Sequence, residues 1–292
     1  MKFANLQFNN AAFIALVDTD SGRFWPVADL VPGFSGDMIQ LVHDFDRIKS
    51  RLDAKGEGQP LAQAKVLAPI AQPRRNIFCV GKNYHEHARE FSQSGFDSSA
   101  AKGEVAPTAP VVFTKAPSSA VGHGATVERH AGVTEQLDYE AELGVIIGKP
   151  GRGIAPADAW SHIAGYTVIN DVTARDLQHK HRQWFLGKSM DTFCPMGPWI
   201  VTADGVDGAN LDVRCWINGE LRQDANTRDL IFDIPTLIAT LSAGIALQPG
   251  DVIATGTPAG VGIGFKPPRF LQSGDEMKVE IQHVGTLVNR VG

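Results

Sequence analysis

The sequence predicts a fold of many short β-strands and few helices, with a small N-terminal module ahead of a larger domain. Apolar runs of strand length, bounded by glycine, proline and asparagine, recur along the chain. Only a few stretches show the apolar spacing of a helix. A proline-marked linker at residues 71–75 separates the two parts of the chain. We therefore expect two domains, residues 1–72 and 73–292.

Composition narrows the range of functions. An apolar content of 43% and a charged content of 20% are typical of a globular protein. A net charge of −5 gives no reason to expect nucleic acid or an anionic membrane as a partner. No apolar run is long enough to span a bilayer. Three widely spaced cysteines fit a reducing compartment, so we expect a cytoplasmic protein.

The N-terminal module carries no obvious chemistry. Residues 12–17 and 23–27 predict a hairpin around a polar turn, and apolar residues recur at nearly helical spacing from residue 38 to residue 52. No cluster of possible ligands occurs there. A structural or oligomer-supporting role is therefore expected.

The first candidate catalytic residues follow a short apolar strand at residues 76–81. Residues 82–90 have the composition of a helix, on which His87 and Glu90 share a face. A carboxylate beside an imidazole fixes its tautomer and raises its basicity, which makes the pair a candidate general base. The alternative is a surface His–Glu pair, and His85 offers a rival pairing.

A candidate lid comes next. Residues 91–103 are rich in Ser, Ala and Gly, which is typical of a mobile loop. Because this loop follows the candidate catalytic helix, it could cover the site. The strand that follows, residues 111–115, ends at Lys115.

Two glutamates on one strand are candidate metal ligands. Residues 137–148 predict a buried strand, and alternation places Glu140 and Glu142 on one face. Adjacent carboxylates repel each other and are costly to desolvate, and a divalent cation would offset both costs. Asp171, at the end of the apolar strand 163–171, is placed to be a third oxygen ligand. The alternative is an exposed strand edge with two solvated acids.

The turn after Asp171 carries possible anion-binding residues. Arg175 and Gln178 share a face there and could bind a substrate carboxylate. His179 and His181 have the spacing of a metal-binding pair, but their strongly polar neighbours predict solvated side chains. Lys188 is either functional or extends to solvent, because a buried lysine is costly without an anion.

The C-terminal part alternates strands and turns. A hairpin, a helix with proline in its first turn and a closing meander are predicted at residues 211–223, 233–242 and 274–289. Residues 247–262 predict a strand that opens into a glycine-rich loop without the Lys-Ser/Thr pair of a phosphate-binding loop. Thr255 and Thr257 in this loop could offer hydroxyl groups to a ligand carboxylate.

A series of short motifs occurs in order between Asn76 and Arg290. They are Cys79-Val-Gly-Lys-Asn-Tyr84 with His87 and Glu90, Phe113-x-Lys115, Asp138-Tyr-Glu-Ala-Glu-Leu143, Asn170-Asp-Val-Thr-Ala-Arg-Asp176, Gly187-Lys188 with Pro195-x-Gly-Pro198, and Thr255-Gly-Thr-Pro-x-Gly260. In order and spacing they resemble the fumarylacetoacetate hydrolase family.

The resemblance implies an α+β fold of layered, mostly β sheets, a homodimer and, as in bacterial members, a short N-terminal domain. It implies that Mg²⁺ or Mn²⁺ is bound by Glu140, Glu142 and Asp171. It also implies a catalytic dyad of His87 and Glu90. Substrate or transition-state contacts are implied for Lys115, Arg175, Gln178, Lys188 and Thr257.

The family acts on small 2-oxo acids whose C3 becomes an enolate stabilised by the metal. We expect hydrolysis of a C–C bond in a 2,4-dioxo acid of the acylpyruvate or fumarylpyruvate type. The dyad would activate water, the pyruvate enolate would leave, and Lys188 would assist catalysis. The alternatives are an oxaloacetate-type decarboxylase, a 2-hydroxymuconate-type isomerase or decarboxylase and, last, a non-catalytic binding protein. His85 and the insert up to residue 103 depart from the family pattern and leave the far end of the substrate open.

Overall fold

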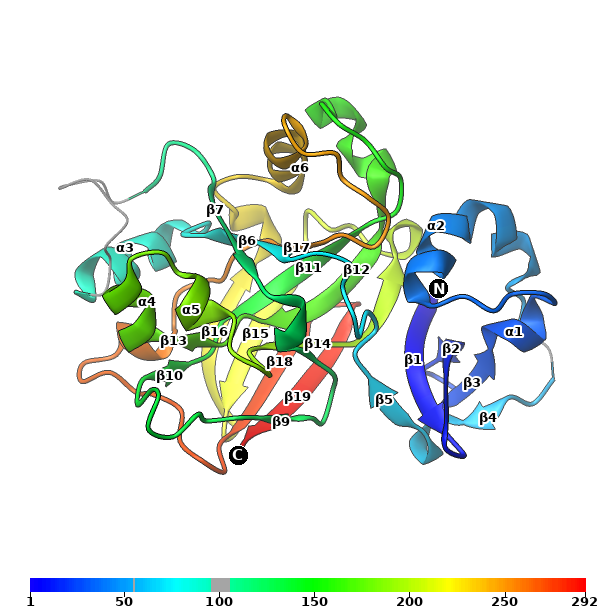
Figure 1. The fold of residues 1–292 in the computed structure, drawn as a ribbon, viewed down its shortest axis with the longest axis horizontal. Coiled ribbons are helices and arrows are strands. Elements are labelled where there is room, and N and C mark those ends of the chain that lie inside the picture. The colour runs from blue at the N-terminus through cyan, green and yellow to red at the C-terminus, as the bar shows by residue number, and fades with distance from the viewer. Residues whose placement is uncertain (55, 96–105) are drawn as a thin grey trace.

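The computed structural model describes residues 1–54, 56–95 and 106–292, and its largest element is a twelve-stranded sheet (Figure 1). The main path of this sheet runs through β4 (Gln59–Pro60), β3 (Arg23–Pro26), β2 (Ala11–Asp18), β1 (Lys2–Phe8), β14 (Cys194–Thr202), β12 (Ile163–Asn170), β11 (Ala141–Ile147), β17 (Val252–Ala254), β6 (Ile77–Gly81) and β7 (Val111–Lys115). Two short strands extend it, β5 (Lys65–Leu67) on β1 and β8 (Ala120–Val121) on β14.

A five-stranded sheet packs against the central part of the large one. Its order is β16 (Glu220–Asn226), β15 (Asp212–Ile217), β18 (Glu276–Ile281), β19 (Gly285–Val291) and β9 (Thr126–Val127). Alternate residues of β18, Met277, Val279 and Ile281, are buried and join Val145 and Val168 of the large sheet in one core. The predicted hairpin and closing meander are thereby confirmed, as is the layered, mostly β, α+β fold.

Helices lie around the sheets rather than between them. They are α1 (Val27–Leu30), α2 (Met38–Ile48), α3 (His85–Gln93), α4 (Arg175–His181), α5 (Phe185–Lys188) and α6 (Ile234–Ser242). Among the described residues, no helix is long and apolar enough to cross a membrane. The predicted helices in the N-terminal module and at residues 233–242 are confirmed. Each is capped by an aspartate, because Asp37 and Asp233 accept hydrogen bonds from Gln40 N and Thr236 N.

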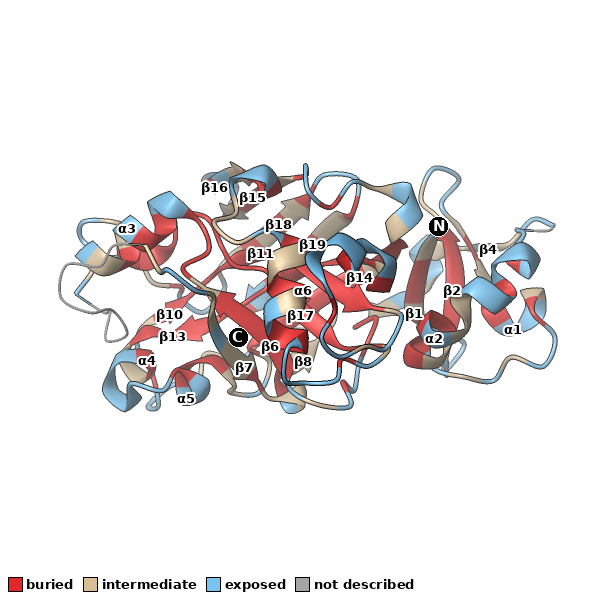
Figure 2. Ribbon diagram, turned by 90° about the horizontal axis from the view of Figure 1, so that it is seen from above, coloured by how far each residue is buried: buried red, intermediate tan, exposed pale blue. Residues whose placement is uncertain are grey.

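The N-terminal strands continue the large sheet. β1 pairs with β2 on one side and with β14 on the other, where Lys2 faces Val201 and Phe3 faces Ile200. Figure 2 shows that β1 and β14 are buried where they meet. The hairpin predicted in this module is formed by β2 and β3. The division into domains at residue 72 stays a prediction.

The strand predicted over residues 137–148 is interrupted. A two-residue ladder joins β10 (Leu137–Asp138) to β13 (Thr173–Ala174), and β11 begins only at Ala141. Between them the backbone bonds to side chains: Tyr139 N donates to Asp138 Oδ1 at 2.9 Å, and Glu140 N donates to Asn170 Oδ1 at 3.0 Å. A neighbouring strand is therefore not needed to satisfy these groups.

The segment predicted to be a lid, residues 91–103, begins as a helix and not as a loop. Phe91 is buried in α3, which continues to Gln93, so the first residues of the predicted loop are helical. Residues 96–105, the greater part of the predicted lid, lie outside the described residues.

We predict that Gly187→Ala destabilises the protein. A Cβ at Gly187, on α5, would lie 2.6 Å from Gln178 N and 2.8 Å from Ala174 O of the adjacent α4 segment. Both neighbours are backbone atoms, so α5 must move away from α4. We expect a loss of about 1–3 kcal/mol in the free energy of unfolding, measured in urea.

The matched control is Gly244→Ala, since a Cβ at exposed Gly244 meets nothing within 4 Å. We expect it to change stability by less than about 0.5 kcal/mol. Equal effects from the two substitutions would show that close α4–α5 packing is not required.

Candidate active site

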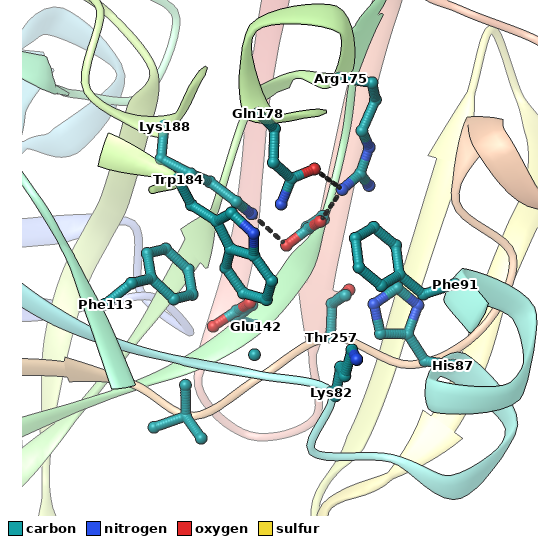
Figure 3. A pocket seen from close by; sticks show the side chains of 13 residues that line it. Lys82, His87, Phe91, Phe113, Glu142, Arg175, Gln178, Trp184, Lys188 and Thr257 are labelled. Atoms are coloured by element: carbon teal, nitrogen blue, oxygen red, sulfur yellow. Dashed lines mark hydrogen bonds and ion pairs between the residues drawn. The ribbon is translucent and has the colours of Figure 1, made fainter. Parts of the chain in front are cut away.

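Most of the predicted site residues line one pocket (Figure 3). The wall is formed by the end of β6, α3, β7, β11, α4, α5 and the loop after β17. The predicted residues on it are His87, Glu140, Glu142, Arg175, Gln178, Lys188 and Thr257. Segments far apart in the sequence therefore meet at one site.

Three carboxylates form the centre of this site. Ligand oxygens of Glu140, Glu142 and Asp171 lie within 4.8 Å of one another, and each residue is at most 4% exposed. The backbone holds them together, because Asp171 N donates to Glu140 O at 2.8 Å. Burial, and then the charges of Asp171 and Glu140, raise the pKa of Glu142 well above its usual value.

Buried cations compensate two of these acids. Lys188 Nζ lies 2.7 Å from both Glu140 Oε2 and Asp171 Oδ2, and Lys115 Nζ lies 2.5 Å from Asp171 Oδ1. Burial alone would raise the pKa of Glu140, but the charges of Lys188 and Arg175 outweigh it and lower the value to about 2. Lys115 also donates to Val172 O at 3.1 Å and is not part of the pocket wall. Its contacts place it behind Asp171, where it orients that carboxylate.

Arg175 connects the carboxylates to a possible substrate. Its Nε donates to Asp138 Oδ2 at 2.9 Å, and its Nη1 lies 2.7 Å from Glu140 Oε1 and 3.1 Å from Gln178 Oε1. Its Nη2 is buried without a hydrogen-bond partner among the described residues. A buried guanidinium donor left unpaired at a pocket is suited to an incoming carboxylate.

The His–Glu pair forms as the spacing predicted. His87 Nδ1 lies 3.3 Å from Glu90 Oε2, and Glu90 Oε1 accepts a hydrogen bond from Gly260 N at 3.0 Å. His87 is 4% exposed and lines the pocket, so its Nε2 is the ring nitrogen available to a ligand. Among the described residues, no hydrogen bond or ion pair joins His85 to a carboxylate, and Arg89 instead binds Glu86 at the surface.

Of the remaining candidate residues, one threonine lines the pocket and the others do not. Thr257 lines the pocket and its Oγ1 accepts from Gln223 Nε2 at 2.8 Å, whereas the Thr255 hydroxyl donates to Leu143 O at 3.0 Å. Thr255 is therefore not a pocket residue. His179 and His181 are exposed, as their polar neighbours predicted.

The sequence did not single out Asp138 and Lys82 as site residues. Asp138 is fully buried and accepts hydrogen bonds from Arg175 and from the backbone N–H groups of Gly262 and Ile263. In the sequence, only the position of Asp138 two residues before Glu140 could have indicated that it belongs to the site. Lys82 lines the pocket and is 5% exposed, and only its place in the Cys79–Tyr84 motif pointed to it.

The carboxylate cluster suits a divalent cation. Its donors are hard oxygens, and one member, Glu142, forms no ion pair with a cation among the described residues. Its Oε2 accepts a hydrogen bond from Gly256 N at 2.8 Å. Burying three like-charged groups is costly without a counter-ion, and Mg²⁺ or Mn²⁺ prefers such ligands.

Residues 76–292 match the family model described as fumarylacetoacetate (FAA) hydrolase C-terminal. The chain belongs to the fumarylacetoacetate hydrolase family. Oxaloacetate tautomerase YisK of Bacillus subtilis (strain 168) is 42% identical over 314 residues, with all of both chains covered. The match to this relative covers the whole chain, including the N-terminal part that lies outside the family model.

Two solved structures extend the comparison. A fumarylacetoacetate hydrolase from psychrophilic Exiguobacterium antarcticum is 42% identical, with a TM-score of 0.81, covering 100% of this chain and 99% of that one. Maleylpyruvate hydrolase from Sphingobium sp. SYK-6, in complex with manganese(II) and pyruvate, is 32% identical, with a TM-score of 0.78, covering 100% and 98%.

We predict that Glu142→Gln abolishes tight binding of Mn²⁺. The substitution removes one of three carboxylate ligands, and we expect the Kd from calorimetric titration of metal-free protein to rise about a hundredfold or more. Mn²⁺ should raise the Tm of the wild type but not that of Glu142→Gln. The metal-free variant should be no less stable than the metal-free wild type, because the substitution removes like-charge repulsion.

Glu86→Gln is the matched control, because Glu86 is an exposed glutamate paired with Arg89. It should bind Mn²⁺ as the wild type does. Wild-type affinity in Glu142→Gln would contradict the assignment of the metal site.

Proposed function

We propose that the protein is a metal-dependent tautomerase that interconverts the keto and enol forms of oxaloacetate. The observation that carries the proposal is the meeting, in one pocket, of the His87–Glu90 pair, the carboxylate cluster and the unpaired donor of Arg175. The 42% identity to oxaloacetate tautomerase YisK over the whole chain supports the choice of reaction.

Glu140, Glu142 and Asp171 are the residues that would hold Mg²⁺ or Mn²⁺. The bound cation would supply positive charge to the carboxylate and 2-oxo oxygens of the substrate. Arg175 Nη2 binds the substrate carboxylate, and Gln178, which accepts from Arg175 Nη1, orients the guanidinium.

His87 moves the proton. Its Nδ1 faces Glu90, so Nε2 takes a proton from C3 of the substrate while the electron pair of that C–H bond forms the C2–C3 double bond. The C2 oxygen takes up a proton to complete the enol, and His87 returns its proton to solvent, so that the reaction is balanced. Lys188, held at Glu140 and Asp171, places a positive charge beside the oxygen that gains electron density.

Hydrolysis of a C–C bond in a 2,4-dioxo acid, as predicted from the sequence, is the second candidate. The solved structure of maleylpyruvate hydrolase with manganese(II) and pyruvate favours it, at 32% identity. In that reaction His87 would take a proton from water, the hydroxide would attack C4, and the C3–C4 bond would break with protonation of C3.

Two further expectations from the sequence also stay proposals. They are that the protein forms a homodimer and that it is located in the cytoplasm.

We predict that His87→Asn slows enol–keto interconversion of oxaloacetate about 10²- to 10⁴-fold in kcat, because the variant has no general base. The rate is followed by the loss of enol absorbance in Mn²⁺-loaded protein. The exposed His179→Asn serves as the control and should keep the wild-type rate. An unchanged rate in His87→Asn would exclude His87 as the base.

A substrate panel separates the two candidate reactions. Acetylpyruvate, fumarylpyruvate and oxaloacetate are each incubated with Mg²⁺-loaded protein, and both pyruvate release and enol loss are measured. A tautomerase should accelerate enol loss from oxaloacetate without releasing pyruvate from the other two acids. Rapid pyruvate release from an acylpyruvate, with no acceleration on oxaloacetate, would overturn the tautomerase in favour of the hydrolase.

A further inference from the structure

Lys82 is a charged pocket residue to which the mechanism above gives no role. It lies between β6 and α3, its side chain is almost completely buried, and it lines the same pocket as His87 and Thr257. In the view of Figure 3, these three side chains lie toward the lower right of the pocket and Lys188 lies toward the upper left.

The ring of Phe91 relates Lys82 to the catalytic groups. The Lys82 ammonium lies 5.6 Å from the centre of this ring, the His87 ring centre lies 6.1 Å from it, and the Arg175 guanidinium carbon lies 6.0 Å from it. The ammonium, the candidate base and the candidate carboxylate-binding group therefore surround one aromatic side chain.

The backbone at Lys82 is unusual. Its φ of +55° lies in the left-handed region, which residues other than Gly, Asn and Asp seldom adopt. The next residue holds the chain in place, because the Asn83 side chain donates to Thr255 O at 2.7 Å and accepts from Phe232 N at 2.8 Å. A buried lysine kept in this conformation beside a pocket is a candidate for a functional role.

Two further cations of the pocket, Lys188 and Arg175, lie at the acidic cluster. They form ion pairs with Glu140, Asp171 or Asp138. Lys82 brings positive charge to the pocket from a different element, the end of β6. A substrate whose 2-oxo acid end lies at the cluster must present C3 to His87, so a substituent on C3 extends toward the side where Lys82 lies.

We propose that Lys82 binds the second carboxylate of a dicarboxylic 2-oxo acid and thereby selects diacids over monoacids. This inference rests on the proposed function, because it takes the 2-oxo acid end of the substrate to lie at the acidic cluster. A charge-assisted hydrogen bond from the ammonium to that carboxylate is the interaction that discriminates.

The test compares two acids that differ only in the far group. Oxaloacetate carries a carboxylate where 2-oxobutyrate carries a methyl group. Exchange of the C3 hydrogens with deuterated solvent is measured for both by NMR, with Mn²⁺-loaded wild type, Lys82→Met and Lys82→Arg. Lys82→Met should lower the ratio of kcat/KM for oxaloacetate to that for 2-oxobutyrate about ten- to a hundredfold, mainly through KM. Lys82→Arg, which keeps the charge, should recover most of the ratio.

Lys180→Met is the matched control, because Lys180 is an exposed lysine on α4 outside the pocket. Its ratio should equal that of the wild type. If Lys82→Met lowers kcat/KM equally for oxaloacetate and 2-oxobutyrate, with a normal Tm, Lys82 has a role other than carboxylate selection. If the substitution lowers kcat/KM for neither acid, Lys82 does not bind substrate. Both results overturn the proposal.

Binding of inert analogues separates this inference from the proposed function. Malate and 2-hydroxybutyrate differ by the same two groups, and their Kd values are measured by calorimetry on the same Mn²⁺-loaded proteins. If the wild type catalyses exchange in neither 2-oxo acid, the tautomerase proposal fails. Selective weakening of malate binding in Lys82→Met would then still support the carboxylate site, and equal binding of malate by wild type and variant would overturn it.

Discussion

The structure of the site depends on the cost of burying like charges close together. Ligand oxygens of Glu140, Glu142 and Asp171 lie within 4.8 Å of one another at almost zero exposure, and each charge removed from water costs several kcal/mol unless it is compensated. Lys188 and Lys115 offset part of that cost from two different elements, α5 and β7. A divalent cation would offset the remainder, since Glu142 gains no such ion pair among the described residues.

The glycine-rich loop after β17 joins the separate parts of the site. Its backbone N–H groups donate to three acids with different duties: Gly256 to Glu142, Gly260 to Glu90 and Gly262 to Asp138. Glu142 belongs to the carboxylate cluster, Glu90 is paired with the candidate base His87, and Asp138 accepts a hydrogen bond from Arg175. One loop therefore sets the relative positions of all three groups without contributing a charged side chain.

Backbone geometry explains why glycine is needed in that loop. Gly260 has a φ of +102°, and a Cβ there would overlap the backbone carbonyl of Arg222. The close approach brings the loop against β16, where the Gln223 side chain donates to Thr257 Oγ1 and Pro258 O. The sequence suggested that this loop contributes hydroxyl groups, whereas in the structure its backbone N–H groups donate the hydrogen bonds to the acids of the site.

The sequence by itself determined the elements and most of the residue types at the site, because strand alternation and helix spacing are local properties. It placed Glu140 beside Glu142 and His87 beside Glu90, and both pairs are found together. Tertiary structure alone decided the partners that come from distant segments. Lys115 was predicted to contact substrate but lies against Asp171, and Asp138 supports Arg175 across 37 residues of sequence. Such contacts depend on how the sheets stack and where the loop after β17 passes, and no spacing within one segment records that.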